Sequence, residues 1–265
     1  MKLSLIVTTY ERPDALACVL KSIERQSFPP DEILIADDGS GPATRSLVES
    51  FRTRCACPLV HCWQTHDGFR VCRARNLALS RATGDYTALV DGDMVMHPQF
   101  IADHRRCARP GYWVQGTRIL LDARRTTEMI GGRSSPLPLY SSGIGGLRRL
   151  SAIRAPLLSS ALARAANAFV ATKSCNLAAW RADLERVNGF NEEMVGWGPE
   201  DKELAARLAH AGVARRTLIF GGIAYHLAHP PASRERRAAN ERALADTLAQ
   251  RRVECARGLR QHQQR

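Results

Sequence analysis

The sequence predicts an α/β fold in which a mostly parallel sheet is flanked by helices. Three observations lead to this fold class. Short apolar, β-favouring runs alternate with segments of helical periodicity over the first 93 residues. Acidic clusters directly follow two of these runs, and the carboxyl ends of parallel strands are where ligands bind in such folds. The length of 265 residues suits one compact domain, and we expect it to carry a mobile insert and a C-terminal helical tail.

The first half of the chain contains four predicted strands, at residues 3–9, 32–36, 59–63 and 86–90. Helical spacing of apolar residues predicts the intervening helices around residues 16–23, 47–51 and 75–81. The second strand runs into Asp37-Asp38-Gly39-Ser40 and the fourth into Asp91-Gly92-Asp93. Both acidic clusters are therefore expected at one edge of the sheet.

The second half of the chain is less regular. Residues 123–168 are rich in Gly, Ser, Pro and Arg, and we expect a variable basic insert there with one short helix. Order is expected to return at residues 169–176, followed by a helix at 200–210 and a strand at 217–220. Residues 233–265 predict a charged helix with a frayed end. The chain thus divides into segments 1–122, 123–168, 169–232 and 233–265.

The composition limits the location and partners of the protein. No apolar run approaches the roughly 18 residues of a membrane-spanning helix, and the N-terminus resembles neither a signal peptide nor an anchor. Eight irregularly spaced cysteines predict reduced thiols, so we expect a cytoplasmic protein. A net charge of +12 favours polyanionic partners. No Asp or Glu occurs between Glu128 and Asp183, so this stretch is either a peripheral contact with the anionic inner face of a membrane or a solvated basic face.

Asp91-Gly92-Asp93 is the first candidate site. Two carboxylates two residues apart after a buried strand repel one another unless a cation or hydrogen-bond donors compensate them. Oxygen ligands beside a diphosphate suit Mg²⁺ or Mn²⁺. The alternative is an ordinary turn in which an Asp caps neighbouring amides. The position after the fourth strand favours the metal site.

A second candidate site is Gly196-Trp197-Gly198-Pro199-Glu200-Asp201. Glycines beside Trp197 would let its ring approach a ligand, and a carboxylate at the start of the next helix can orient and deprotonate a hydroxyl. Pro199 suits a helix start. The alternative is that Glu200 and Asp201 only favour the positive end of a helix.

Four segments together resemble the family 2 glycosyltransferases of the GT-A fold, a Rossmann-like, mostly parallel sheet flanked by helices. They are residues 5–10, Asp37-Asp38-Gly39-Ser40, Ala74-Arg75-Asn76 and Asp91-Gly92-Asp93. The resemblance implies that segment 1–122 binds a nucleotide sugar and that Asp93 binds the metal at its diphosphate. The residues implied to bind the donor nucleotide are Thr8, Tyr10, Arg12, Asp38, Arg75, Asn76, Asp91 and Gly92.

The Trp197 segment resembles the G-W-G-x-E-D segment of inverting galactosyltransferases and bacterial chondroitin-type polymerases. That resemblance implies that Asp201 is the catalytic base, with Glu200 beside it, and that segment 169–232 forms the acceptor and catalytic half. It also implies a metal-binding histidine near residue 226. The remaining predicted residues are Asn176, Trp197 and Gly198 for the acceptor or sugar, and His226 for the metal, with His229 as its substitute.

We therefore expect an inverting, metal-dependent glycosyltransferase. It would transfer a sugar from a nucleotide diphosphate, with UDP favoured by the resemblance, to a hydroxyl of a glycan or glycolipid in bacterial surface polysaccharide or lipopolysaccharide synthesis. A nucleotidyltransferase is one alternative, but residues 8–13 lack the glycines of a phosphate loop. A non-catalytic polyanion-binding protein is the other, although carboxylates at the strand ends would repel a phosphate backbone, so we expect no nucleic-acid partner.

Overall fold

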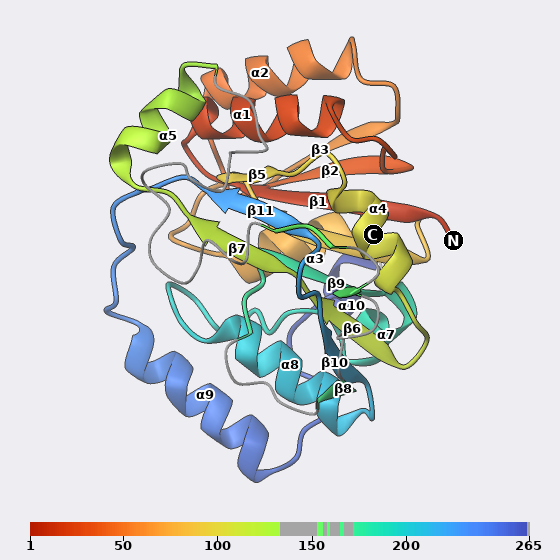
Figure 1. Ribbon diagram of the computed structural model, residues 1–265. Coiled ribbons are helices and arrows are strands. Elements are labelled where there is room, and N and C mark those ends of the chain that lie inside the picture. The colour runs from red at the N-terminus through yellow and green to blue at the C-terminus, as the bar shows by residue number, and fades with distance from the viewer. Residues whose placement is uncertain (133–152, 156–157, 160–164, 167–171, 264–265) are drawn as a thin grey trace.

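The computed structural model describes residues 1–132, 153–155, 158–159, 165–166 and 172–263. The predicted α/β class is confirmed: one large sheet is covered by helices, and a smaller sheet lies beside it (Figure 1). The order in the large sheet is β3-β2-β1-β4-β9-β6-β10-β8. Its strands are β1 (Leu3–Thr9), β2 (Glu32–Asp37), β3 (Leu59–Trp63), β4 (Tyr86–Asp91), β6 (Tyr112–Gln115), β8 (Ala165–Ala166), β9 (Asn176–Trp180) and β10 (Ala214–Thr217).

The N-terminal part of this sheet is parallel. β1 pairs in parallel with both β2 and β4, and β2 pairs in parallel with β3. β9 is antiparallel to both of its neighbours, β4 and β6. The carboxyl ends of β1, β2 and β4 therefore meet at one edge, which carries both acidic clusters.

The smaller sheet has the order β5-β11-β7. It consists of β5 (Met94–Met96), β7 (Thr117–Leu120) and β11 (Ile223–His226). β11 is antiparallel to β5 and parallel to β7. Residues more than a hundred positions apart are thereby joined directly after the Asp91-Gly92-Asp93 turn.

Helices cover both faces of the large sheet. Leu5 and Val7 of β1 pack in one core cluster with α1 and α2, whereas Ile6 packs in a second cluster with α3 and α8. This alternation follows from the two-residue period of a strand buried on both faces. Figure 1 shows α1 and α2 above β1 to β3. The helices are α1 (Pro13–Glu24), α2 (Pro42–Arg52), α3 (Val71–Arg81), α4 (Phe100–Cys107), α5 (Ala123–Ile130), α7 (Arg181–Arg186), α8 (Glu200–His210), α9 (Arg237–Ala249) and α10 (Arg260–Gln263).

Two sequence predictions about the second half need correction. The strand expected at 217–220 ends at Thr217, because Phe220 and Gly222 adopt positive φ angles of 60° and 54° that interrupt extended pairing before β11. The helix expected in the tail is present as α9, but the residues that follow it, up to residue 263, are ordered against the domain and not frayed. Cys255 and Leu259 are buried because the segment after α9 packs back on the domain, where the Leu259 N–H donates to the Asn188 carbonyl at 2.9 Å.

The basic stretch is described only in part. Arg133, Arg148, Arg149 and Arg164 lie outside the described residues. Arg154 forms an ion pair with Asp103 at 2.7 Å, so one charge in the stretch is compensated within the protein. Of the insert 123–168, α5 supplies the expected short helix, and most of the remainder lies outside the described ranges. Among described residues, no helix combines the length and the apolar character needed to cross a bilayer.

Candidate active site

The Asp91-Gly92-Asp93 turn lies against the end of β1. Parallel pairing places Thr8 beside Asp91 in register, and the Gly92 N–H donates to the Thr8 carbonyl at 2.6 Å. A Cβ at Gly92 would lie 2.9 Å from that carbonyl oxygen, so a larger residue would push the turn away from β1. Glycine between the two carboxylates therefore lets both stay at the strand ends.

Two imidazoles converge on Asp93. β5 and β11 pair in a register that sets His226 opposite Met94, and the Leu227 N–H donates to the Asp93 carbonyl at 2.9 Å. His226 Nε2 lies 3.6 Å from Asp93 Oδ1, and His229 Nε2 lies 3.5 Å from Asp93 Oδ2. One ligand atom from each of the three residues falls within 4.8 Å of the others. The structure thus brings both predicted histidines to the predicted carboxylate.

The chemistry of this cluster fits a divalent cation. Asp93 Oδ1 is buried without a hydrogen-bond partner among the described residues, and buried polar atoms are rarely left so. Burial and repulsion from Asp91 raise the pKa of Asp93 to about 6. Burial lowers the pKa of His226 to about 4, so its imidazole is neutral at pH 7, the form that binds metals. Arg12 Nη1, 3.3 Å from Asp93 Oδ2, supplies compensating charge at the rim.

Arg75 joins the strand ends to α8. Its Nη2 lies 2.9 Å from Asp91, its Nη1 lies 3.3 Å from Glu200, and its Nε donates to Thr8 Oγ1 at 3.2 Å. Burial disfavours the charge of Arg75, but the two carboxylates outweigh it and raise its pKa. The resemblance implied a donor contact for Arg75. In the structure its guanidinium is nearly inaccessible to solvent and contacts Asp91, Glu200 and Thr8. Arg75 therefore holds these protein groups together.

Glu200 and Asp201 differ in what they contact. Both lie in the first turn of α8, where carboxylates are favoured by the helix dipole. Glu200 is paired with Arg75, whereas Asp201 accepts from the Lys202 N–H at 2.7 Å and from the Ser174 N–H, and has no ion pair in the described part of the chain. Burial raises the pKa of both, that of Glu200 to about 7. Asp201 is therefore the carboxylate of the two that remains available to a hydroxyl.

Two aromatic rings stack directly after the carboxyl end of β1. The exposed Tyr10 ring lies 4.4 Å from the His66 ring, with 13° between their planes. Sequence reasoning missed His66, because a lone histidine in a loop belongs to no pattern. Asp38, expected to contact the nucleotide, accepts from Gln64 Nε2 at 2.5 Å and from the Arg70 N–H at 2.7 Å. Asp38 therefore braces the loop that carries His66.

Two predicted ligand-binding asparagines are turned into the protein. Asn76 is fully buried and donates to the Phe190 carbonyl and to Glu192, each at 2.8 Å. Asn176 is also fully buried; its Oδ1 lies 2.9 Å from His104 Nε2, and its Nδ2 donates to two backbone carbonyls. Both side chains are used for hydrogen bonds within the protein. Their side-chain amides join segments that are distant in sequence. The spacing of residues along the chain does not predict such contacts.

The loop of residues 195–198, which we call the Trp197 loop, is held by α9. Asn240 Nδ2 donates to the Val195 carbonyl at 3.1 Å and to the Trp197 carbonyl at 3.4 Å. A Cβ on Gly198 would collide with the Asn240 side chain, so Gly198 serves this close approach. Trp197 itself stays 40% exposed.

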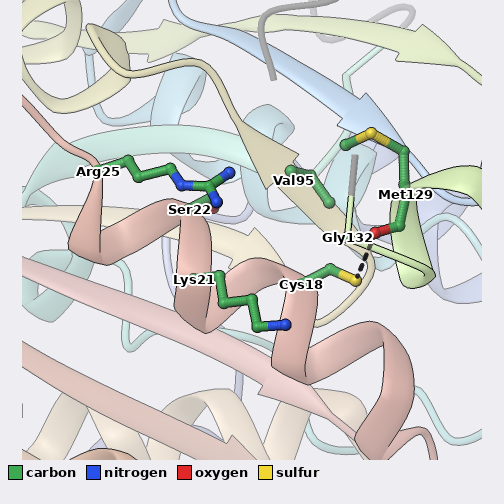
Figure 2. A pocket seen from close by; sticks show the side chains of 7 residues that line it. All are labelled: Cys18, Lys21, Ser22, Arg25, Val95, Met129 and Gly132. Carbon is green, nitrogen blue, oxygen red and sulfur yellow. Dashed lines mark hydrogen bonds between the residues drawn. The ribbon is translucent and has the colours of Figure 1, made fainter. Parts of the chain in front are cut away.

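A pocket lies between α1, β5 and the end of α5 (Figure 2). In the wall of this pocket, Cys18 Sγ donates a hydrogen bond to the Met129 carbonyl at 3.5 Å. It contains none of the predicted site residues, so we assign it no part in the reaction. The residues that line it are Cys18, Lys21, Ser22, Arg25, Val95, Met129 and Gly132.

Two family models match the chain across these elements. Residues 4–106 match glycosyl transferase family 2, and residues 163–230 match the model described as the N-terminal domain of galactosyltransferase. We call residues 4–106 the family 2 segment, after the model that they match. The predicted resemblance is confirmed: the family 2 segment contains Asp91 and Asp93, and the second match contains Asp201 and His226.

Curated relatives of the chain are longer proteins. Validoxylamine A glucosyltransferase of Streptomyces hygroscopicus subsp. limoneus is 29% identical over 222 residues, which cover 80% of this chain and 48% of that protein. Chondroitin synthase of Escherichia coli is 27% identical over 276 residues, which cover 94% of this chain and 38% of that protein. The chain thus spans about half or less of the length of these relatives.

Solved structures share the fold. Staphylococcus aureus TarS 1-349 in complex with UDP aligns with a TM-score of 0.59 at 20% identity, covering 93% of this chain and 65% of that one. The mannosyltransferase PcManGT from Pyrobaculum calidifontis, in complex with GDP-Man and Mn²⁺, aligns with a TM-score of 0.58 at 20% identity, covering 85% and 56%. The GT-A fold expected from the family 2 resemblance is confirmed.

Proposed function

We propose that the protein is an inverting, metal-dependent glycosyltransferase that moves a sugar from a UDP-sugar to an acceptor hydroxyl. One observation carries the proposal: Asp93, His226 and His229 converge at the strand ends, on the same sheet edge as Asp91, which Arg75 links to the start of α8. A cation-binding cluster and an available carboxylate on connected elements are what transfer from a nucleotide diphosphate requires.

Asp93, His226 and His229 would hold the cation. One carboxylate and two imidazoles suit Mn²⁺ better than Mg²⁺, which prefers oxygen ligands. The cation supplies charge neutralisation for the departing diphosphate. Arg12 at the rim would add positive charge beside the phosphates, and Tyr10 would offer its exposed ring to the nucleobase.

Asp201 would act as the base. Its carboxylate takes the proton from the acceptor hydroxyl as the oxygen attacks the anomeric carbon from the face opposite the diphosphate, and a single displacement of this kind inverts the configuration. The raised pKa of Asp201 makes its ionised form a better proton acceptor than an ordinary aspartate. Glu200, neutralised by Arg75, would keep α8 and the strand ends in register.

The acceptor is proposed to be a glycan or glycolipid of a bacterial surface polysaccharide or lipopolysaccharide. Support comes from the relatives, which include a chondroitin synthase and a glucosyltransferase, and from the UDP and GDP-Man complexes of structural neighbours. We further propose a cytoplasmic location with peripheral contact of the basic stretch at the inner membrane face, because the chain carries a net charge of +12. Absence of binding to anionic liposomes at low salt would overturn that contact.

Calorimetric binding of UDP, GDP and TDP, with and without Mn²⁺, tests the donor site. We expect Mn²⁺ to strengthen the binding of UDP and Asp93→Ala to abolish that metal dependence. His226→Ala should weaken Mn²⁺ binding at least about tenfold and His229→Ala less, since the His229 side chain is 34% exposed against 16% for His226. The proposal would be contradicted if Mn²⁺ did not change the affinity for any nucleotide and if none of the three variants changed it either.

A further inference from the structure

The exposed ring of Trp197 is flanked by two arginines from the tail. The guanidinium carbon of Arg234 lies 5.3 Å from the ring centroid and that of Arg237 lies 5.8 Å from it, both within the range of cation–π contact. Both arginines lie beyond residue 230, where the second family match ends. The tail therefore places positive charge on the aromatic side chain closest in sequence to Glu200 and Asp201.

The position of these arginines relative to the carboxylates is set by packing. Asn240 of α9 holds the Trp197 loop through two backbone carbonyls, and Thr247 of α9 donates to Glu203 of α8 at 3.0 Å. Figure 1 shows α9 alongside α8. Because α8 begins at Glu200, the helix that orders Arg237 is tied directly to the helix that carries Asp201.

The two arginines differ in how far their charge is already compensated. Arg237 pairs with Glu241 at 2.7 Å, whereas Arg234 has no carboxylate partner among the residues that the structure describes. A guanidinium lying over an aromatic ring keeps its N–H edge free for oxygen acceptors. That edge matches carboxylates and phosphates, which it can bind through two parallel hydrogen bonds.

We propose that Trp197, Arg234 and Arg237 form an acceptor subsite for a sugar ring that carries an anionic group, a carboxylate or a phosphate. The inference rests on the proposed transferase function and specifies its acceptor class. The ring of Trp197 packs on the apolar face of the sugar, and Arg234 binds the anionic group. Arg237, partly neutralised by Glu241, supports the positive potential at the same place.

The test is binding of small probes followed by the indole N–H signal of Trp197 in a ¹H–¹⁵N correlation spectrum, assigned with Trp197→Phe. The probes are methyl β-D-glucuronide, glucose 6-phosphate and the neutral methyl β-D-glucoside. At low salt we expect at least one anionic sugar to bind about tenfold more tightly than the neutral one, the size of one charge-assisted hydrogen bond. The two anionic probes distinguish a carboxylate from a phosphate.

Arg234→Gln should abolish the preference for the anionic sugar while leaving the weak binding of the glucoside unchanged. Arg242→Gln is the matched control, since Arg242 is an exposed arginine of α9 in the same tail and the same charge is removed. Arg234→Lys, which keeps the charge without the two-pronged edge, should retain part of the preference. These arginines are exposed, so the variants are expected to fold.

Equal affinity for charged and neutral sugars, an equal effect of Arg234→Gln and Arg242→Gln, or no shift of the Trp197 signal with any probe would overturn the subsite. In those cases the arginines only clamp the tryptophan. The measurement contains no nucleotide, metal or turnover. Failure of the subsite is therefore distinct from failure of the transferase proposal, which would appear as loss of Mn²⁺-dependent UDP binding.

Discussion

The strand-end cluster of Asp91, Asp93, His226 and His229 and the Trp197 loop are held in different ways. Backbone ladders position Asp91 and His226 of the first, because β1 pairs with β4 and β5 pairs with β11. The Trp197 loop is positioned by the Asn240 side chain of α9 and by the Gly196 N–H, which donates to the Phe69 carbonyl at 2.8 Å. A ladder constrains the backbone whatever the neighbouring side chains are, whereas a loop held partly by a helix side chain depends on the sequence of that helix.

This difference separates two parts of the proposed function. The strand-end cluster lies within the two matched segments, while α9 lies outside both. A change in the tail can therefore alter what the Trp197 loop binds without disturbing the strand ends. Variants of the strand-end cluster should accordingly affect the binding of UDP and Mn²⁺, whereas variants of the tail should affect what the Trp197 loop binds.

The largest expected effect comes from Asp201→Asn. Without a proton acceptor at this position, the rate of transfer should fall about 10²- to 10⁴-fold, while UDP binding with Mn²⁺ stays nearly unchanged. Turnover is followed by release of UDP, and binding by calorimetry. Glu193→Gln, an exposed acid in the same segment, is the control and should keep full activity. Joint loss of binding and transfer in Asp201→Asn would show that the carboxylate supports the fold rather than the reaction.

A moderate effect is expected from Gly198→Ala. The new methyl group would collide with Asn240, so the free energy of unfolding should fall by about 1–3 kcal/mol and the environment of Trp197 should change. Thermal unfolding and tryptophan fluorescence measure both effects. Gly41→Ala, whose Cβ would meet only the flexible Glu11 side chain at 3.3 Å, should change little.

UDP binding by Gly198→Ala should equal that of the unaltered protein, since β1, β4, β5 and β11 do not depend on the Trp197 loop. A loss of UDP binding as large as the loss of stability would remove the distinction between the two regions.

The smallest expected effect is a shift of the pH profile. Burial raises the pKa of Asp201, and the base acts only when ionised, so kcat/KM should fall as the pH drops through that raised value, above the ordinary aspartate pKa of about 3.9. Glu200 also titrates in the acidic range, because burial and the Asp201 carboxylate raise its pKa to about 7. Glu200→Gln removes that second titration, so the acidic limb of this variant should be that of Asp201 alone. Loss of the acidic limb in Glu200→Gln would indicate that Glu200, and not Asp201, is the base.

Much of the donor side was predictable from sequence. The alternation of strands and helices, the Asp91-Gly92-Asp93 turn and the acidic start of α8 are local patterns, because each arises from neighbouring residues and from strand or helix periodicity. The structure places the polar ends of β1 and β4 together because parallel strands end at one edge. The resemblance added the histidines, which no local pattern connects to Asp93.

Only the tertiary structure decided how the polar side chains are used. Asn76 and Asn176 resemble ligand-binding residues in sequence, yet both are fully buried, since their amides satisfy backbone groups that packing cuts off from water. The stacking of His66 on Tyr10 and the arginines around Trp197 depend on loops and a tail that meet across long sequence separations. Sequence by itself determined the local elements and the order of the carboxylates. Which side chains meet depends on strand pairing and helix packing, which no local period encodes.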